Sequence, residues 1–163
     1  MNFDELYNNN FDRIYSYLRC RLGSDSTAED LCSAVFYKVF RSIGQFSASR
    51  GEPVQWLFGI ARNEVNSHLR RKALVSFVSL NLFGDIFREK PETHREENPA
   101  AVKLKELIKG LDRRERDLIS LKFYSELNNR QIAALTGLSE SNVGTILYRC
   151  MKKLRRKMGG ENL

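Results

Sequence analysis

The chain has 163 residues, of which 42% are hydrophobic and 29% charged, and its formal net charge is +7 at pH 7. This length suits one ordinary domain or two small ones, and the apolar share excludes a chain that is disordered throughout. No apolar run reaches the roughly 18 residues of a membrane span, and the first residues, MNFDELYNNN, are acidic where a signal peptide is basic. We therefore expect a cytoplasmic protein without a membrane partner.

The spacing of apolar residues is helical over most of the chain, and there are only three prolines, so we expect an all-α protein. Cys20, Cys32 and Cys150 are odd in number and lie far apart in the sequence. This pattern predicts buried, reduced thiols and neither a metal site nor a disulfide framework.

Two helices are predicted in the N-terminal part. The first runs from Phe3 to about Leu22, and Ser26 with Glu29 forms a capping box that starts the second. The second helix has a strong apolar face, which comprises Ala28, Leu31, Cys32, Val35, Phe36, Val39, Phe40 and Ile43. Its opposite face has few charges and comprises Glu29, Asp30, Ser33, Ala34, Tyr37 and Arg41. Periodicity alone leaves open whether this opposite face is solvated or docks on a partner.

Residues 44–52, GQFSASRGE, predict a loop, and Pro53 suits the first turn of a third helix that extends to about Lys72. Polar and basic side chains lie on the outer face of that helix, namely Arg62, Asn63, Asn66, Arg70 and Arg71. A loop aromatic and a loop cation beside such a face are typical of a single-strand site, in which Phe46 stacks on a base and Arg50 contacts a phosphate. General burial trends favour the alternative, in which Phe46 is a core residue.

Residues 74–98 predict a flexible linker that is apolar in its first half and acidic in its second. Asn98 with Pro99 marks the start of a second domain, and Asp112 with Glu115 caps a further helix. Lysine and arginine exceed the acidic residues by two in residues 1–76 and by seven in residues 100–163, whereas residues 77–99 have a deficit of two. We therefore expect the C-terminal part to contact phosphates.

Residues 128–154, NNRQIAALTGLSESNVGTILYRCMKKL, predict two short helices joined by a tight turn. Asn128 caps the first helix, Gly137 ends it, and Ser139 caps the second, while Ala133 supplies a small side chain at the crossing. The second helix has a buried stripe of Val143, Leu147, Cys150 and Leu154 opposite a polar and basic face. The pattern favours a helix-turn-helix that reads the major groove over an ordinary helical hairpin with a charged surface.

Sequence signatures of catalysis are missing. We find no phosphate-binding glycine loop, nucleophile elbow or H-E-x-x-H motif, so we expect neither an enzyme nor a cofactor or metal.

Four stretches in order carry a resemblance to a known family: AEDLCSAVFYKVF (residues 28–40), Phe46 with WLFGIARNEVNSHLRR (56–71), LDRRERDLISLKFY (111–124) and IAALTGLSESNVGTILYRCMKKLR (132–155). Together they resemble a bacterial RNA polymerase sigma factor of the extracytoplasmic-function group, in the sigma-70 superfamily. The resemblance spans nearly the whole chain. It implies binding to core RNA polymerase and to promoter DNA, with an anti-sigma factor as a further candidate partner.

The resemblance also implies roles for domains and residues. Residues 1–73 would bind polymerase and open the minus-ten element, residues 74–98 would be the linker, and residues 99–163 would read the minus-thirty-five element. The polymerase contacts would be Asp30, Ser33, Ala34, Tyr37 and Arg41. The minus-ten contacts would be Phe46, Ser49, Arg50, Arg62, Asn63, Asn66 and Arg70. The minus-thirty-five contacts would be Ser139, Ser141, Asn142, Thr145, Arg149, Lys152 and Lys153.

The chain departs from the family pattern at two places. Relatives often carry Gln-Glu where this chain has Ser33 and Ala34, and basic residues where it has Gly144 and Ile146. We therefore expect a polymerase contact on the second helix that differs or depends on neighbouring residues. Direct base contacts in the minus-thirty-five element would fall to Ser141, Asn142 and Thr145, and backbone contacts and DNA shape would carry much of the recognition.

A free-standing helix-turn-helix regulator with an N-terminal dimerisation or sensing domain is the alternative function. Such a regulator would bind a two-fold symmetric site as a dimer, without polymerase.

Overall fold

The structure is a computed structural model that describes residues 2–82 and 98–159, with side-chain detail except at residues 50 and 77–82. All regular structure in these ranges is helical, which confirms the all-α prediction. The N-terminal domain consists of α1 (Phe3–Leu22), α2 (Asp25–Ser42), the short turns η1 (Ile43–Gln45) and η2 (Ala48–Arg50), and α3 (Pro53–Leu82). The C-terminal domain consists of α4 (Pro99–Lys109), α5 (Arg113–Ile119), the π-helical turn η3 (Ser120–Tyr124), α6 (Asn129–Thr136) and α7 (Glu140–Met158).

Helices α1 and α2 pack against each other through aromatic rings. The ring centroids of Tyr7 and Phe36 lie 4.7 Å apart and those of Phe11 and Phe36 lie 5.9 Å apart, within the range of favourable aromatic pairs. Helix α1 ends at Leu22, as predicted, because Gly23 takes the left-handed region at φ 72°.

The predicted start of α2 is wrong, because the helix begins before the proposed Ser26–Glu29 capping box. Ser24 is the N-cap, and its hydroxyl accepts a hydrogen bond from the Thr27 amide at 3.4 Å. One apolar assignment on this helix is also wrong. Phe40 was predicted to be buried, yet its side chain is 60% exposed.

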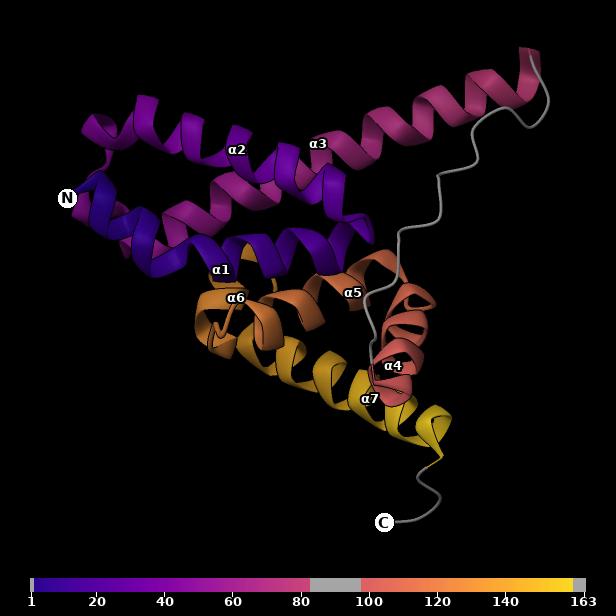
Figure 1. Ribbon diagram of the computed structural model, residues 1–163. Helices are drawn as coiled ribbons and strands as arrows, with labels where there is room; N and C mark the ends of the chain where they lie inside the picture. The colour runs from indigo at the N-terminus through magenta and orange to yellow at the C-terminus, as the bar shows by residue number, and fades with distance from the viewer. Residues whose placement is uncertain (1, 83–97, 160–163) are drawn as a thin grey trace.

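Helix α3 continues past its predicted end at Lys72 to Leu82, through the first part of the predicted linker. The segment contains neither glycine nor proline after Lys72, so nothing in its sequence ends the helix. Its distal part extends away from the rest of the molecule (Figure 1). The remainder of the predicted linker, residues 83–97, lies outside the described residues.

Every helix start predicted in the C-terminal domain is confirmed. Asn98 caps α4, and the capping boxes of Asp112 with Glu115 and of Asn128 with Gln131 start α5 and α6. Gly137 ends α6 in the left-handed region at φ 74°, and Ser139 caps α7. These caps fix the residue at which each helix starts. Helices α6 and α7 are therefore joined by the tight turn that the sequence predicts.

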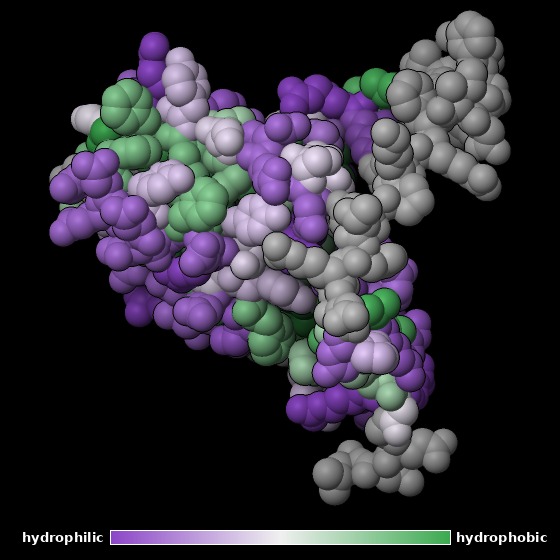
Figure 2. All heavy atoms as spheres, viewed as in Figure 1, coloured by the Kyte–Doolittle hydropathy of each residue, from purple (hydrophilic) through white to green (hydrophobic). Residues whose placement is uncertain are grey.

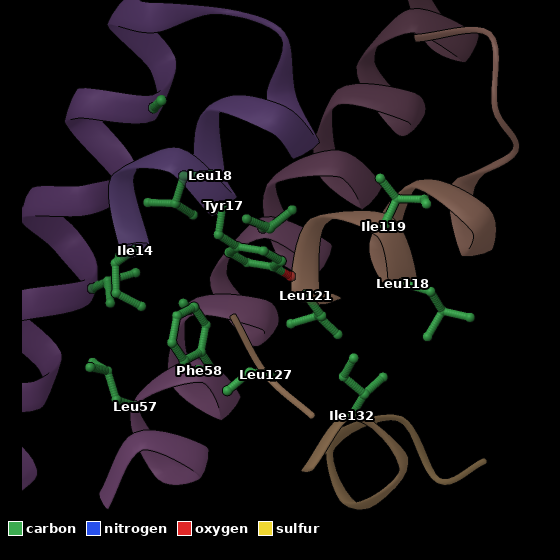
Figure 3. Close-up of a cluster of buried hydrophobic side chains, with 14 of the residues drawn as sticks. Ile14, Tyr17, Leu18, Leu57, Phe58, Leu118, Ile119, Leu121, Leu127 and Ile132 are labelled. Carbon is green, nitrogen blue, oxygen red and sulfur yellow. The ribbon is translucent and has the colours of Figure 1, made fainter. Parts of the chain in front are cut away.

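The two domains share one hydrophobic core. Helices α1 and α3 both contact the C-terminal helices, and α2 packs on α1 and α3 (Figure 1). Figure 3 shows side chains of both domains in one cluster, with Tyr17 and Phe58 from the N-terminal domain beside Leu121 and Leu127 from the C-terminal domain. Each domain covers part of the apolar surface of the other and removes it from water. This burial stabilises the packed arrangement of the two domains.

Candidate nucleic-acid interface

Helix α7 presents its first turn and its outer face to solvent. Ser141, Asn142, Thr145, Arg149 and Lys152 are exposed, while Val143, Leu147, Cys150 and Leu154 are buried on the opposite side. The Ser139 hydroxyl accepts a hydrogen bond from the Asn142 amide, so it acts as the helix cap. Within α7 no acidic residue follows Glu140, and the last turns of the helix are rich in lysine and arginine. This is the surface that a helix needs to lie in a groove between phosphates.

Lys153 is placed differently from the other residues predicted for this surface. Its ammonium lies 3.0 Å from Glu115 Oε2 on α5, and this hydrogen bond raises the pKa of the lysine. The side chain therefore ties α7 to α5 within the domain.

The two positions that depart from the family pattern have local explanations. A side-chain carbon at Gly144 would meet Asn129 Nδ2 of α6 at 3.5 Å, so this position faces the neighbouring helix. Ile146 is partly buried and packs against the core. Neither position is part of the exposed polar face of α7.

The loop between α2 and α3 forms a second exposed region. Residues 47–49 and 51–52 are exposed, and the Ser47 and Ser49 hydroxyls lie 2.8 Å apart. Phe46 is half-buried, with its ring centroid 5.4 Å from that of Trp56. Arg50 lies in η2, and its side chain is outside the described detail. Phe46 thus combines a packing contact with partial exposure.

Some side chains on the outer face of α3 are exposed, and others bind residues of other helices. Asn63 and Arg70 are exposed. Arg62 is partly buried, and its Nε donates to Asp117 Oδ2 at 2.8 Å while its Nη1 donates to the Leu135 carbonyl at 3.1 Å. Asn66 Oδ1 accepts a hydrogen bond from Arg21 at 3.0 Å. Arg62 is therefore in contact with the C-terminal domain.

Asp117, on α5, lies at the centre of a buried polar cluster between the domains. Its Oδ1 accepts a hydrogen bond from the Tyr17 hydroxyl at 3.1 Å and lies 3.2 Å from Arg21 Nε. Burial and, to a lesser extent, the negative charge of Asp117 raise the pKa of Tyr17. The phenol consequently keeps its proton at physiological pH and donates a hydrogen bond to the carboxylate.

A cavity of about 490 Å³ opens beside this cluster, between α3 and α5. We name it the arginine pocket, and it is lined by Arg21, Arg62, Asn63, Asn66, Arg70, Arg113, Arg114 and Asp117. Five guanidinium groups face one carboxylate there, which makes the pocket attractive to anions.

Helix α2 has an exposed face that includes aromatic side chains. Tyr37 is 62% exposed and lies on the same helix as the exposed residues Asp30, Ser33 and Arg41, with Ala34 half-buried. Phe40 adds to this face, and its ring packs edge-on against Phe3 at 5.3 Å. Figure 2 shows hydrophobic side chains gathered over the α1–α2 end of the molecule. Exposed aromatic groups of this kind are typical of protein-docking surfaces.

Sequence reasoning missed Tyr17 and Asp117 of the interdomain cluster. Tyr17 and Asp117 are one hundred positions apart, and each lies inside a helical pattern that predicts only local packing. Asp117 directly precedes the apolar residues Leu118 and Ile119, and this position next to a buried stretch was the one available signal.

Comparison with known proteins adds independent findings. The family model for sigma-70 region 2 matches residues 6–75, and that for sigma-70 region 4 matches residues 101–154. The sigma factor SigM of Bacillus subtilis is 26% identical, with 95% of this chain and 94% of SigM covered. The sigma factor BldN of Streptomyces coelicolor is 29% identical over 94% of this chain, which spans only 59% of the length of BldN.

Solved structures agree on the fold. The sigma factor RpoE of Bartonella quintana, solved with the anti-sigma factor NepR, has a TM-score of 0.79 at 19% identity, with 98% of each chain covered. The two sigma-70 regions match the two domains described above, in the same order, and the likeness to extracytoplasmic-function relatives covers almost the whole chain. The chain therefore belongs to the sigma-70 family as a sigma factor of the extracytoplasmic-function group, which directs RNA polymerase to initiate transcription at promoters.

Proposed function

We propose that the two domains divide promoter recognition between them. In this division the C-terminal domain, from residue 99, inserts α7 into the major groove of the minus-thirty-five element. Ser141, Asn142 and Thr145 contact base edges, and Arg149 and Lys152 contact phosphates. The observation that carries the proposal is the exposure of this face on a helix whose opposite stripe is buried.

The N-terminal domain, through residue 73, binds the minus-ten element in the proposed division. Opening a duplex costs a few kcal/mol per unstacked step, and capture of an extruded base offsets part of that cost. Phe46 and Ser49 lie on an exposed loop beside the polar face of α3, where Asn63 and Arg70 are accessible. Arg50, Arg62 and Asn66 complete the proposed strand contact.

The exposed face of α2 is the proposed polymerase-docking surface. Asp30, Ser33, Tyr37 and Arg41 are exposed there, and we add Phe40 to the set. Ser33 and Ala34 replace the Gln-Glu of many relatives. In this chain Tyr37 and Phe40 therefore supply apolar contact where relatives have polar groups. In this proposal the chain acts in the cytoplasm, where RNA polymerase is located. It acts by binding and does not catalyse a reaction.

An anti-sigma factor is a further proposed partner. RpoE of Bartonella quintana was solved with NepR, and CnrH, which has a TM-score of 0.66 at 18% identity, was solved with the cytosolic domain of CnrY. Likeness at this identity supports a shared fold. Affinity purification of this chain followed by mass spectrometry should recover its anti-sigma factor.

Transcription in vitro tests the proposal directly. Purified chain, core polymerase and genomic DNA should give transcripts that start at discrete promoters, with permanganate-reactive thymines at the minus-ten element. A chain that adds no promoter selectivity to core polymerase would refute the proposed division of labour. Light scattering separates the alternative, because a free-standing regulator should be a dimer that protects a symmetric site without polymerase.

A further inference from the structure

The arginine pocket has one wall from each domain. Arg62, Asn66 and Arg70 are spaced four residues apart, so they lie on one face of α3 and form the first wall. Arg113 and Arg114, in the first turn of α5, belong to the opposite wall. A molecule in the pocket therefore contacts side chains of both helices.

Two buried groups, Arg21 and Asp117, line the inner end of the pocket. Arg21 Nε lies 3.2 Å from Asp117 Oδ1. Arg21 also donates to Asn66 Oδ1 of α3 at 3.0 Å and to the Arg113 carbonyl of α5 at 3.2 Å. These bonds hold the two walls together, so the cavity is formed before a ligand binds, as is usual for small-molecule sites.

The pocket has a large excess of positive charge. Among the residues that the structure describes, its lining contains five arginines and one aspartate, which gives a formal net charge of +4. The Asp117 carboxylate is bound at 2.8 Å by Arg62, so it compensates charge at the inner end. Arg70, Arg113 and Arg114 are exposed and extend the positive charge to the outer part. Because like charges at close range repel one another, a bound anion stabilises this arrangement.

The size and charge of the pocket suit a compact polyphosphate group. A volume of about 490 Å³ is within the range of small-molecule sites, which is about 300–1,000 Å³. A guanidinium group binds phosphoryl oxygens through two parallel N–H donors. Adjacent phosphoryl groups place several negative charges in one small volume, whereas a DNA strand carries one charge per phosphate. The concentrated charge of the pocket therefore favours a polyphosphate over a strand.

We propose that the arginine pocket binds a small molecule with two or three adjacent phosphoryl groups, either free or attached to a nucleoside. The phosphoryl oxygens accept hydrogen bonds from guanidinium groups of α3 and α5 together. Arg70 is also a proposed strand contact, whereas Arg113 and Arg114 are not. The site goes beyond the proposed function and does not depend on promoter recognition.

Isothermal titration calorimetry of the full chain with sodium tripolyphosphate tests the proposal. We expect one site per chain and an affinity about tenfold or more above that for inorganic phosphate at equal ionic strength, because the longer ligand reaches both walls. Arg114→Gln should weaken tripolyphosphate binding by about tenfold, as expected for one lost charge-assisted contact. Equal affinity of the wild type and Arg114→Gln would overturn the proposal.

Arg130→Gln is the matched control. It removes the same charge from an exposed position on α6 that does not line the pocket, and it should leave the affinity unchanged. An equal loss in both variants would show that the ligand responds to the net charge of the chain and not to the pocket, and the proposal would be wrong. Arg70→Gln, on the opposite wall, should give the same loss as Arg114→Gln. It replaces that variant if circular dichroism shows that Arg114→Gln does not fold.

Single-stranded DNA distinguishes the proposed ligand from a nucleic-acid strand. The probe is a fluorescein-labelled, mixed-sequence strand of about 20 nucleotides, and fluorescence anisotropy measures its affinity. Arg114→Gln should bind this strand within about twofold of the wild type, because the proposed strand contacts lie on α3 and the preceding loop. If the variant loses strand binding and tripolyphosphate binding to the same extent, the pocket is part of the strand path and the proposal fails.

GTP distinguishes a nucleoside triphosphate from a free polyphosphate. If GTP binds at least as tightly as tripolyphosphate and loses affinity in Arg114→Gln, the pocket accepts the nucleoside as well as the phosphates. Weaker binding of GTP than of tripolyphosphate identifies a free polyphosphate as the ligand class. If neither compound binds more tightly than inorganic phosphate, the pocket is not a polyphosphate site.

Discussion

Gly144 is a helix-interior glycine on α7 without a positive φ to require it. A side-chain carbon at this position would be in ordinary van der Waals contact with Asn129, at 3.5 Å. Glycine at such a position costs helix stability because its backbone loses the most conformational freedom on folding. Glycine at position 144 therefore lowers the stability of α7, although the backbone conformation there does not require glycine.

Gly144→Ala should raise the free energy of unfolding by about 0.5–1 kcal/mol, the difference in helix propensity between the two residues. Urea denaturation followed by circular dichroism measures the change. Gly137→Ala is the control and should destabilise the protein, because Gly137 has φ 74°. A loss of stability in Gly144→Ala would mean that Asn129 cannot move by the small distance required.

The buried thiols give a second prediction at this scale. Burial raises the pKa of Cys32 and Cys150 from the ordinary value of 9.0 to about 11. As pH rises the unfolded chain loses these protons first, so the thiols stabilise the fold fully below about pH 9 and lose that contribution between about pH 9 and 11. The stability gap between the wild type and a Cys32→Ala, Cys150→Ala variant should narrow over this range. A difference in the free energy of unfolding that stays constant in urea titrations from about pH 8 to 11 would contradict this prediction.

Helix boundaries were predictable where a polar side chain caps its own neighbouring backbone. Asn98, Asp112, Asn128 and Ser139 all start helices as expected, because a capping bond depends on two or three adjacent residues. The errors arose where the local signal was ambiguous. Two serines compete at the start of α2, and the apolar segment after Lys72 suits a helix as well as a linker.

Arg149 tests α7 as an element. Arg149→Ala should weaken binding to most DNA duplexes by a similar factor and lower the slope of log affinity against log salt by about 1, as expected for one lost phosphate contact. Fluorescence anisotropy at several salt concentrations measures both. Lys103→Ala, which removes an exposed cation from α4, should leave the slope unchanged. A change confined to one DNA sequence would instead indicate that Arg149 contacts a base.

The arrangement of the whole molecule was beyond the reach of the sequence. The contact of Arg13 with Ser125 and that of Tyr17 with Asp117 join residues one hundred or more positions apart. A single sequence carries no signal for such pairs, because helical periodicity identifies a buried face without identifying what covers it. The sequence predicts a polar face on α3, but the contact of that face with α5 was not foreseen.

Tyr17→Phe removes one donor from the interdomain cluster and keeps the buried ring. We expect a loss of about 2 kcal/mol in the free energy of unfolding, the range for a hydrogen bond to a charged group, with a larger radius of gyration. Urea denaturation and small-angle scattering measure the two effects. Tyr148→Phe is the control, since Tyr148 is 68% exposed and should contribute little. Unchanged stability in Tyr17→Phe would mean that water replaces the phenol on Asp117.

The length of α3 has a consequence for promoter spacing. A helix of 30 residues is about 45 Å long, and the end of α3 carries the start of the connection to the C-terminal domain well away from α1 and α2. Covalent geometry allows residues 83–97 to cover at most roughly 50 Å. If the domains separate, the C-terminal domain stays attached through the end of α3. The length of α3 and of the connection then sets an upper limit on the distance between two DNA elements that one copy of the protein can bind together.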